Sequence, residues 1–229
     1  MPDLMDPVDN LIKLILKNFY ANPHDHVFTV AISGIDASGK GYVAKRLEKR
    51  LTSEGLRVAN INVDPWQNPI PIRLNEENPA ENFYQNVFRW SDVFDQLIVP
   101  LRKNKSIQLT SRLIASHADE YFDFEFSYQN IDILLIEAIL LFQKRLLRHY
   151  DYKIWIDCSF KTGLQRALKR NVERLTPERL VEDYGKYYYP AQRVHFRRDN
   201  PKELSDVIYC NDQLLGTVGQ VTVNSQGVS

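Results

Sequence analysis

A glycine-rich segment between an apolar run and an amphipathic run constrains this 229-residue chain more than any other feature. Residues 27–32 form a short, β-branched run that is typical of a buried strand. Gly34-Ile-Asp-Ala-Ser-Gly-Lys-Gly41 follows, and Val43, Leu47 and Leu51 then recur at helical spacing. The segment therefore predicts a strand, a tight loop and a helix in that order.

The loop has the spacing Gly34-x-x-x-x-Gly39-Lys40, which is typical of a phosphate-binding loop. Its glycines let backbone N–H groups point at phosphate oxygens, while the lysine reaches the terminal phosphates. A plain glycine turn is the alternative, and the spacing, the lysine and the flanking elements all oppose it. We predict that a nucleotide is bound by Gly34, Ala37, Ser38, Gly39, Lys40 and Gly41.

The last position of this loop departs from the usual pattern. Serine or threonine there normally supplies a hydroxyl ligand to Mg²⁺, but this chain has Gly41. Ser38 lies too early in the loop to be assumed as its substitute. We therefore expect Mg²⁺ to be held mainly by phosphate oxygens, water and acidic groups, and more weakly than in a loop with the hydroxyl.

The alternation of strand and helix patterns indicates the fold class. Further strand patterns lie at 58–63, 131–136, 154–156 and 207–209, and helical patterns at 8–20, 80–103 (punctuated by Pro100), 161–174 and 177–188. This order predicts an α/β fold with a mainly parallel sheet and helices on both faces. Ligands bind such sheets beyond the carboxyl ends of the strands. The glycine loop, Asp64, Glu137 and Asp157 all follow predicted strands and should meet at that edge.

No linker rich in proline, glycine or serine divides the chain. We expect an N-terminal helix and lead-in over residues 1–26 and one domain over residues 27–215. Residues 216–229 are expected to form a C-terminal edge strand or a flexible tail.

The charge balance and the apolar runs exclude several partners. The chain has 29 Lys and Arg against 29 Asp and Glu, without the basic excess of a protein that coats nucleic acid or an anionic membrane. Residues 131–142 fall short of the roughly 20 apolar residues that span a bilayer, and the acidic N-terminus is unlike a signal peptide. Cys158 and Cys210 lie in apolar segments, which fits a reducing compartment. We predict a cytoplasmic protein that binds a small-molecule substrate and neither nucleic acid nor membranes. The sequence allows a homo-oligomer but does not predict one.

The acids at the strand ends are the candidate catalytic groups. Asp64 can accept the proton of an attacking hydroxyl, or it can cap the turn before Pro65. Glu137 ends a buried strand, where an acid is costly unless it meets a metal, water or a cation, so we expect it to contact Mg²⁺ through water. Asp157 is expected to be a structural cap.

Basic residues concentrate late in the chain, with eleven Lys and Arg against five Asp and Glu over residues 161–202. Arg166, Arg170 and Arg174 recur every four residues on one face of a predicted helix, where they can close over a polyphosphate; a solvated basic face is the alternative. The segment 188–201 looks too irregular for a core element. Its basic side chains are predicted as nucleotide contacts or as a surface loop: Arg193, His195 and Arg197.

The order of these features resembles the uridine kinase family of P-loop kinases, which is related to phosphoribulokinase and bacterial pantothenate kinase. The likeness runs from about residue 27 to 212. It is carried by the 34–40 loop, Asn62-Val-Asp64-Pro-Trp, Asn78-Pro-Ala-Glu-Asn-Phe83, residues 101–109, residues 131–142, Ile154-Trp-Ile-Asp-Cys-Ser-Phe and Leu164-x-Arg166-x-x-x-Arg170. The resemblance implies a three-layer P-loop NTPase sandwich with a helical lid. It also implies Mg²⁺, with ATP, or alternatively GTP, as donor of the γ-phosphoryl group to the 5′-hydroxyl of uridine or cytidine.

The resemblance also implies roles for single residues. Asp64 would be the base, Lys40 would contact the phosphates, and Arg166 and Arg170 would be lid arginines. The predicted substrate side comprises Phe83 near the base, His117 at the nucleoside, Arg112 in place of a family tyrosine, and Arg174.

Two alternatives to a nucleoside kinase stay open. Arg112 and Arg193 would favour an anionic acceptor of the sugar phosphate or pantothenate type. Gly41 leaves open a nucleotide-binding regulatory protein with little turnover, because its Mg²⁺ would be weakly held.

Overall fold

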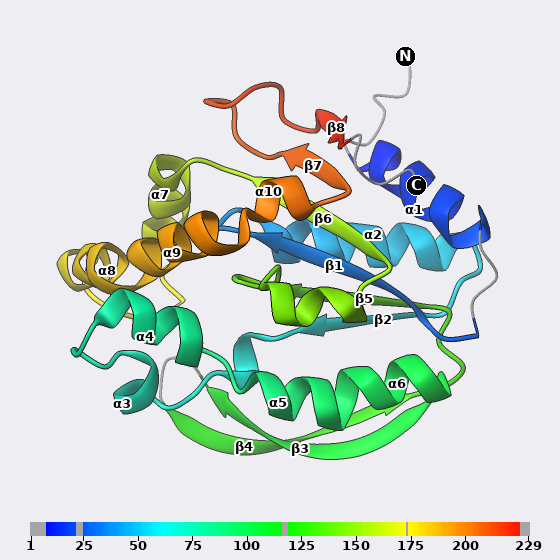
Figure 1. Ribbon diagram of the computed structural model, residues 1–229, viewed down its shortest axis with the longest axis horizontal. Coiled ribbons are helices and arrows are strands. Elements are labelled where there is room, and N and C mark those ends of the chain that lie inside the picture. Colours follow the sequence, from blue (N-terminus) through cyan, green and yellow to red (C-terminus); the bar gives the residue numbers. More distant parts are fainter. Residues whose placement is uncertain (1–7, 22–24, 116–118, 173, 225–229) are drawn as a thin grey trace.

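The computed structural model describes residues 8–21, 25–115, 119–172 and 174–224 (Figure 1). In this part of the chain a six-stranded sheet has the order β2-β5-β1-β6-β7-β8, and β3 and β4 pair separately. The strands are β1 (Phe28–Gly34), β2 (Val58–Asn62), β3 (Ile107–Ala115), β4 (Glu120–Tyr128), β5 (Ile133–Ala138), β6 (Tyr152–Asp157), β7 (Val207–Cys210) and β8 (Val221–Val223). The first five strands of that order pair in parallel, and β8 is antiparallel to β7. The predicted α/β fold with a mainly parallel sheet is confirmed.

Helices cover both faces of the sheet. They are α1 (Asp9–Ala21), α2 (Lys40–Ser53), α3 (Ile70–Arg73), α4 (Pro79–Asn86), α5 (Trp90–Val93), α6 (Val99–Asn104), α7 (Phe160–Arg170), α8 (Pro177–Asp183), α9 (Tyr189–Asp199) and α10 (Pro201–Leu204). Shorter turns are η1 (Asp64–Trp66), η2 (Phe94–Ile98), η3 (Lys144–His149) and η4 (Tyr184–Tyr188). No helix within the described ranges is both long enough and apolar enough to cross a bilayer.

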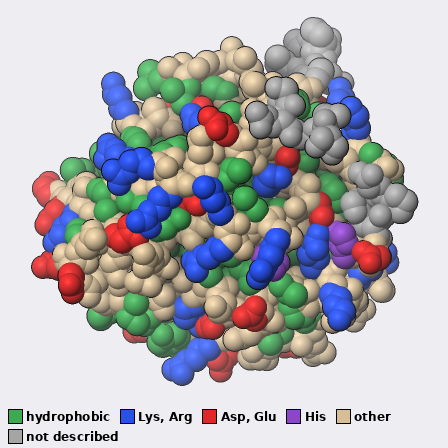
Figure 2. All heavy atoms as spheres, in the orientation of Figure 1, with side chains coloured by type: hydrophobic (Ala, Val, Ile, Leu, Met, Phe, Trp, Pro, Cys, Tyr) green, Lys and Arg blue, Asp and Glu red, His purple; other side chains and the backbone are tan. Residues whose placement is uncertain are grey.

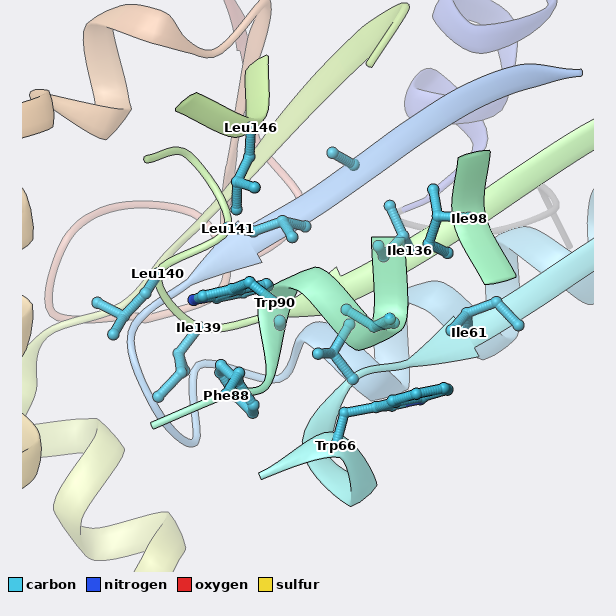
Figure 3. Packing of buried hydrophobic residues seen from close by; sticks show 14 of the residues in the cluster. Ile61, Trp66, Phe88, Trp90, Ile98, Ile136, Ile139, Leu140, Leu141 and Leu146 are labelled. Carbon is cyan, nitrogen blue, oxygen red and sulfur yellow. The ribbon is translucent and has the colours of Figure 1, made fainter. Parts of the chain in front are cut away.

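Two apolar clusters sandwich the sheet, which is why its central strands are apolar on both sides. On β5, Ile133 and Leu135 belong to the cluster with α1 and α2, whereas Leu134 and Ile136 belong to the cluster with α5, η2 and α6. Figure 3 shows part of the second cluster, in which Trp90 and Ile98 from these helices lie with residues of β2, β5 and the segment after β5. A third, smaller cluster joins α7, α8 and η4 to Ala37 of the glycine loop.

The prediction of one helical segment over 80–103 is wrong in detail. α4 ends at Asn86, and Phe88 pairs with Gln67 before α5 begins. Pro100 lies in the first turn of α6 and does not break the helical segment that begins at α5. The π-helical turn η2 directly precedes α6 and accommodates the proline. A proline lacks the N–H of a regular helix and its ring crowds the carbonyl four residues earlier, and a widened π turn relieves this. The same arrangement recurs where η4 precedes Pro190 of α9.

The hairpin of β3 and β4 is absent from the sequence prediction. Its register pairs Ile107 with Tyr128 and Ala115 with Glu120. Phe126 of β4 stacks on Trp66 of η1 with ring centroids 6.1 Å apart, so the hairpin supports the turn that carries Asp64.

The prediction that residues 188–201 are irregular is also wrong. Residues 189–199 form α9, where His195 and Asp199 are buried and Nδ1 of His195 lies 2.8 Å from Oδ2 of Asp199. The same carboxylate oxygen accepts a hydrogen bond of 2.6 Å from the Tyr84 hydroxyl. His195 is therefore a packed core residue and neither a loop residue nor a nucleotide contact.

Candidate active site

The glycine loop connects β1 to α2 at the carboxyl edge of the sheet, as predicted. Ala37 and Gly39 have φ angles of 53° and 97°, so the backbone turns through the left-handed region twice within three residues. A β-carbon at Gly34 would lie 2.6 Å from the carbonyl oxygen of Ile156, and one at Gly39 would overlap the side-chain amide of Asn211. These contacts explain why glycine is needed at both motif positions.

Lys40 begins α2 and lies against this loop. Its Nζ donates a hydrogen bond of 3.0 Å to the carbonyl oxygen of Ile35, and its side chain is nearly buried. Ser38 is fully buried, and its hydroxyl lies next to the position that a β-carbon of Gly34 would take. The ammonium of Lys40 can therefore reach phosphates above the loop, while the Ser38 hydroxyl is turned into the loop.

A cavity of about 530 Å³, here named the loop pocket, opens beside the loop. Its lining comprises Asp36, Ala37, Gly39, Lys40, Gly41, Tyr42, Lys45, Asn62, Asp64, Glu137, Arg166 and Arg170. The two predicted acids, Asp64 and Glu137, thus meet the loop as the parallel topology requires. Asp157 does not line it, because its carboxylate pairs with Lys202 at 2.7 Å and accepts from the Trp155 indole. Its role is structural, but the prediction of a cap is wrong, because Ser159 caps α7.

Strand register brings Asp64 and Glu137 together. Asn62 pairs with Glu137, and the amide of Val63 donates to the Glu137 carbonyl at 3.1 Å. The Asn62 side chain then accepts a hydrogen bond of 2.8 Å from the Asp64 amide, which turns the chain into η1. Asp64 therefore stands two residues beyond the strand end, at the start of η1, where it lines the loop pocket.

Desolvation and like charge raise the pKa of both carboxyl groups. Desolvation, and then the charge of Asp64, raise the pKa of Glu137 to about 7. Asp64 is exposed to solvent on one side, but the surrounding protein desolvates its carboxylate and raises its pKa against the opposing charge of Lys40. Two acids in this state favour a nearby cation, because it would relieve their mutual repulsion.

Gly41 lies directly beside Glu137 in the wall of the loop pocket. A β-carbon at Gly41 would lie 3.1 Å from Oε1 of Glu137. Among the described residues no cluster of three or more His, Cys, Asp or Glu could hold a metal ion alone. The residues present fit an Mg²⁺ ion that shares Glu137 and Asp64 with phosphate oxygens and water, because a hard cation prefers oxygen ligands and keeps several waters.

A second cavity of about 260 Å³, here named the side pocket, adjoins the first. Its wall shares Asp36, Asn62, Asp64 and Arg170 with the loop pocket, and adds Gln67, Arg73, Phe83, Ile139, Val172 and Tyr188. Phe83 and Tyr188 meet edge to face with centroids 5.0 Å apart. Arg73 is buried and pairs with Asp119 at 3.1 Å. The side pocket is therefore lined by aromatic rings, by side-chain amides, and by positive and negative charges that largely cancel.

α7 brings two arginines to the pockets. Arg166 donates to the carbonyl oxygens of Ser38 at 3.2 Å and Asn211 at 2.8 Å, and Arg170 lies 4.0 Å from Asp36 and lines both pockets. A third cavity of about 430 Å³ lies beyond Arg166, between α7 and the segment after β7. On the face shown in Figure 2, Lys and Arg side chains gather over α9, in keeping with the basic segment of the sequence.

Comparisons with known proteins bear on this site. No family model matches the chain. It is 28% identical over 180 residues to uridine-cytidine kinase B of Dictyostelium discoideum, covering 77% of this chain and 72% of that protein. It is 25% identical over 187 residues to the uridine kinase of Proteus mirabilis (strain HI4320), covering 78% and 84%. The solved structure of a possible uridine kinase from Bacillus stearothermophilus superposes with a TM-score of 0.71 at 22% identity, covering 90% and 98%.

The chain is therefore similar to uridine kinases in sequence and to a possible uridine kinase in fold. The predicted three-layer P-loop fold agrees with this likeness. In this uridine kinase-like protein the phosphate loop, Asp64, Glu137, Arg166 and Arg170 line one pocket, and Phe83 lines the adjoining one.

Other predicted residues of this uridine kinase-like chain lie elsewhere. α7 ends at Arg170 because Asn171 turns into the left-handed region, so Arg174 is exposed outside the helix and the prediction of a three-arginine row is wrong. Arg112 is exposed on β3 with its guanidinium 4.5 Å from the Tyr121 ring, and it lines neither pocket. His117 lies outside the described residues.

The sequence interpretation missed several lining residues. Asp36 stands inside the recognised motif, so its position was available as a signal. Gln67, Arg73 and Tyr188 line the side pocket, and no local pattern in the sequence distinguishes them. Arg193 stacks 5.0 Å from the Phe160 ring, and Arg197 is exposed on α9.

Proposed function

We propose that the protein is an ATP-dependent kinase that transfers the γ-phosphoryl group to a hydroxyl of a small neutral acceptor, most simply a uridine or cytidine nucleoside. The observation that carries the proposal is the position of Asp64. It lines both the loop pocket with Lys40 and the side pocket with Phe83, at the boundary between them. A hydroxyl bound in the side pocket would meet the terminal phosphate there.

The loop pocket would hold the phosphates and the third cavity the nucleotide base. Backbone N–H groups of the loop and the ammonium of Lys40 would face phosphate oxygens. Arg166 is fixed against the loop, and Arg170 stands at the pocket boundary, where its guanidinium would stabilise charge on the transferred group. Most of the rate enhancement would come from positioning and electrostatics.

The two acids would have different tasks. Asp64 would accept the hydroxyl proton as the acceptor oxygen attacks, and its raised pKa makes it a stronger base than an ordinary aspartate. Glu137 is more deeply buried and would hold Mg²⁺ directly or through water, together with the phosphates. When bound, Mg²⁺ supplies positive charge that neutralises the phosphate oxygens.

The balance of charges supports a neutral acceptor. Asp36 and Asp64 offset Arg73 and Arg170 in the side pocket, and Asp119 pairs with Arg73. Arg112 and Arg193, on which the idea of an anionic acceptor depended, do not line it. The edge-to-face pair of Phe83 and Tyr188 offers an aromatic wall against which a flat base would pack, and Gln67 suits its amide edge.

Coupled ADP release tests the proposal. The wild-type protein would be assayed with ATP or GTP and a panel of nucleosides, sugar phosphates, D-glycerate and pantothenate. We expect ADP release that depends on uridine or cytidine. A response only to an anionic acceptor would replace the nucleoside, and nucleotide binding without response to any acceptor would favour a regulatory role.

A further inference from the structure

A cavity of about 450 Å³, here named the η3 pocket, opens where the end of α4, the start of η3 and the end of α9 meet. Its lining includes Tyr84, Gln143, Lys144, Arg145 and Asp199. None of its lining residues also lines the loop pocket, the side pocket or the third cavity. Small-molecule sites in proteins have volumes of about 300–1,000 Å³. The η3 pocket is therefore large enough for a ligand, and the proposed kinase function gives it no task.

Asp199, the acidic residue of this lining, already has partners for both carboxylate oxygens. Oδ1 accepts a hydrogen bond of 3.2 Å from the backbone amide of Lys144. Oδ2 accepts one of 2.6 Å from the Tyr84 hydroxyl and lies 2.8 Å from Nδ1 of His195. Because Asp199 is also buried, its carboxylate has little capacity left to bind a cationic ligand.

The guanidinium of Arg145 is held in place by a buried amide. Nε of Arg145 donates 2.9 Å to Oε1 of Gln143, and Nε2 of Gln143 donates 3.2 Å to the carbonyl oxygen of Tyr84. Gln143 is only 3% exposed, so this support is part of the packed interior. Since Nε is engaged, the two terminal nitrogens remain as coplanar donors, whose spacing matches two oxygens of one phosphate group.

Lys144 adds a second positive charge beside this fork. Lys144 and Arg145 are both exposed, and neither forms an ion pair with an acidic side chain in the part of the chain that the structure describes. A phosphate monoester carries a charge of roughly −1.5 to −2 at pH 7, whereas a carboxylate carries a single charge. Two cations above a satisfied acid therefore favour a phosphate group over a carboxylate.

We propose that the η3 pocket is a second phosphate-binding site, which holds the phosphate group of a small molecule apart from the loop pocket. Arg145 binds two phosphate oxygens, Lys144 supplies further charge, and Gln143 is the positioning residue. The ligand is a phosphate ester or inorganic phosphate, since both present the same oxygens. The site needs no residue of the proposed active site, so it does not depend on the proposed kinase function.

A solvated basic surface is the alternative for these side chains. It predicts that any exposed arginine of η3 contributes equally to weak anion binding, and that the buried amide of Gln143 contributes nothing. Arg148 provides the matched comparison, because it is exposed on η3, donates 3.2 Å from Nε to Nε2 of His149, and does not line the pocket.

Calorimetric titration with inorganic phosphate tests the proposal on the full chain. AMP-PNP and Mg²⁺ are first added to saturation, so that the phosphate positions of the loop pocket are filled. We expect wild type to bind phosphate at one further site. Arg145→Gln should raise its Kd by about 10- to 100-fold, the range for hydrogen bonds to a charged group. Arg145→Lys should recover only part of the affinity, because it keeps the charge without the fork.

Two further comparisons separate a built site from a basic surface. Gln143→Met leaves the charge of the pocket unchanged but removes the support of Arg145, so it should also raise the Kd of phosphate. Arg148→Gln should leave that Kd within about twofold of wild type, as expected for an exposed charge outside the site. Circular dichroism verifies that each variant is folded.

The anions used as probes define the ligand class. Acetate should bind at least about tenfold more weakly than phosphate, as expected for the loss of one charge-assisted hydrogen bond. Tighter binding of ribose 5-phosphate than of phosphate would support a phosphate ester as the ligand, and equal affinity would support inorganic phosphate, provided that Arg145→Gln weakens both. Absence of phosphate binding to the saturated wild type, equal affinity for acetate, or equal losses in Arg145→Gln and Arg148→Gln would each overturn the proposal.

Discussion

Gly41 and Glu137 face each other so closely that a β-carbon on the glycine would lie 3.1 Å from Oε1 of the glutamate. A side chain on the last residue of the phosphate loop would therefore touch this acid near the end of β5, and the carboxylate would have to shift by a few tenths of an ångström to admit it. In a loop with serine or threonine, a hydroxyl would lie beside the acid and share the metal with it.

Gly41→Ser should therefore increase the affinity of the enzyme–nucleotide complex for Mg²⁺. The added hydroxyl would lie beside Glu137 and supply the missing oxygen ligand, so the Mg²⁺ concentration for half-maximal activity should fall several-fold. Gly41→Ala is the matched control, because it adds the β-carbon without the hydroxyl. If Gly41→Ser and Gly41→Thr leave both Mg²⁺ dependence and turnover unchanged, the glycine does not limit metal binding.

Asp64→Asn should lower kcat while nucleotide affinity changes little. The amide keeps the shape of the side chain but cannot take the hydroxyl proton, and general-base catalysis contributes about 10²- to 10⁴-fold. Steady-state ADP release and the Kd of ADP measure the two effects separately. Equal activity in Asp64→Asn and wild type would reject Asp64 as the base.

Arg170→Ala and Arg174→Ala should differ in kcat, although their spacing in the sequence would place both arginines on the same helix face. Arg170 lines both pockets from the last turn of α7, whereas Arg174 is exposed beyond the helix. Loss of a group that stabilises transferred charge costs about 10²- to 10³-fold in kcat, so Arg170→Ala should fall in that range and Arg174→Ala should stay near wild type. A comparable loss in both would place Arg174 in the closed lid.

The parts of the site that the sequence predicted are those with local causes. The phosphate loop is a contiguous motif, and an acid after a buried strand must lie at the carboxyl edge once the strands are parallel. This reasoning places Asp64 and Glu137 at that edge without the strand order. Gly41 stands out because it differs from a fixed pattern at a single position.

The parts that the sequence missed are set by tertiary packing. Arg73 reaches the side pocket from a four-residue helix and pairs with Asp119 across 46 positions, which no periodicity reveals. α7 could have continued to Arg174 on pattern alone, and the left-handed Asn171 ends it. The apolar pattern of α9 is irregular because the buried polar residues His195 and Asp199 interrupt it, and their mutual contact explains how burial is tolerated.

The ionisation of Asp199 should make the free energy of unfolding depend on pH. Burial raises the pKa of Asp199, but hydrogen bonds from His195 and Tyr84 outweigh this and hold the pKa below its ordinary value. A carboxyl whose folded pKa is depressed stabilises the protein above its unfolded pKa of about 3.9, and this contribution is lost as pH falls through the folded pKa. Asp199→Asn should therefore reduce the free energy of unfolding at pH 7 by about 1–3 kcal/mol, the cost of losing hydrogen bonds to a buried charge.

Urea unfolding of wild type and Asp199→Asn from pH 7 to pH 3 measures this dependence. The difference between the two proteins should be constant near neutrality and shrink below about pH 4 as the wild-type carboxyl becomes protonated. Asp123→Asn on the exposed face of β4 is the control, and its difference from wild type should stay small at every pH. A difference for Asp199→Asn that persists unchanged to pH 3 would show that its charge does not stabilise the contact between α4 and α9.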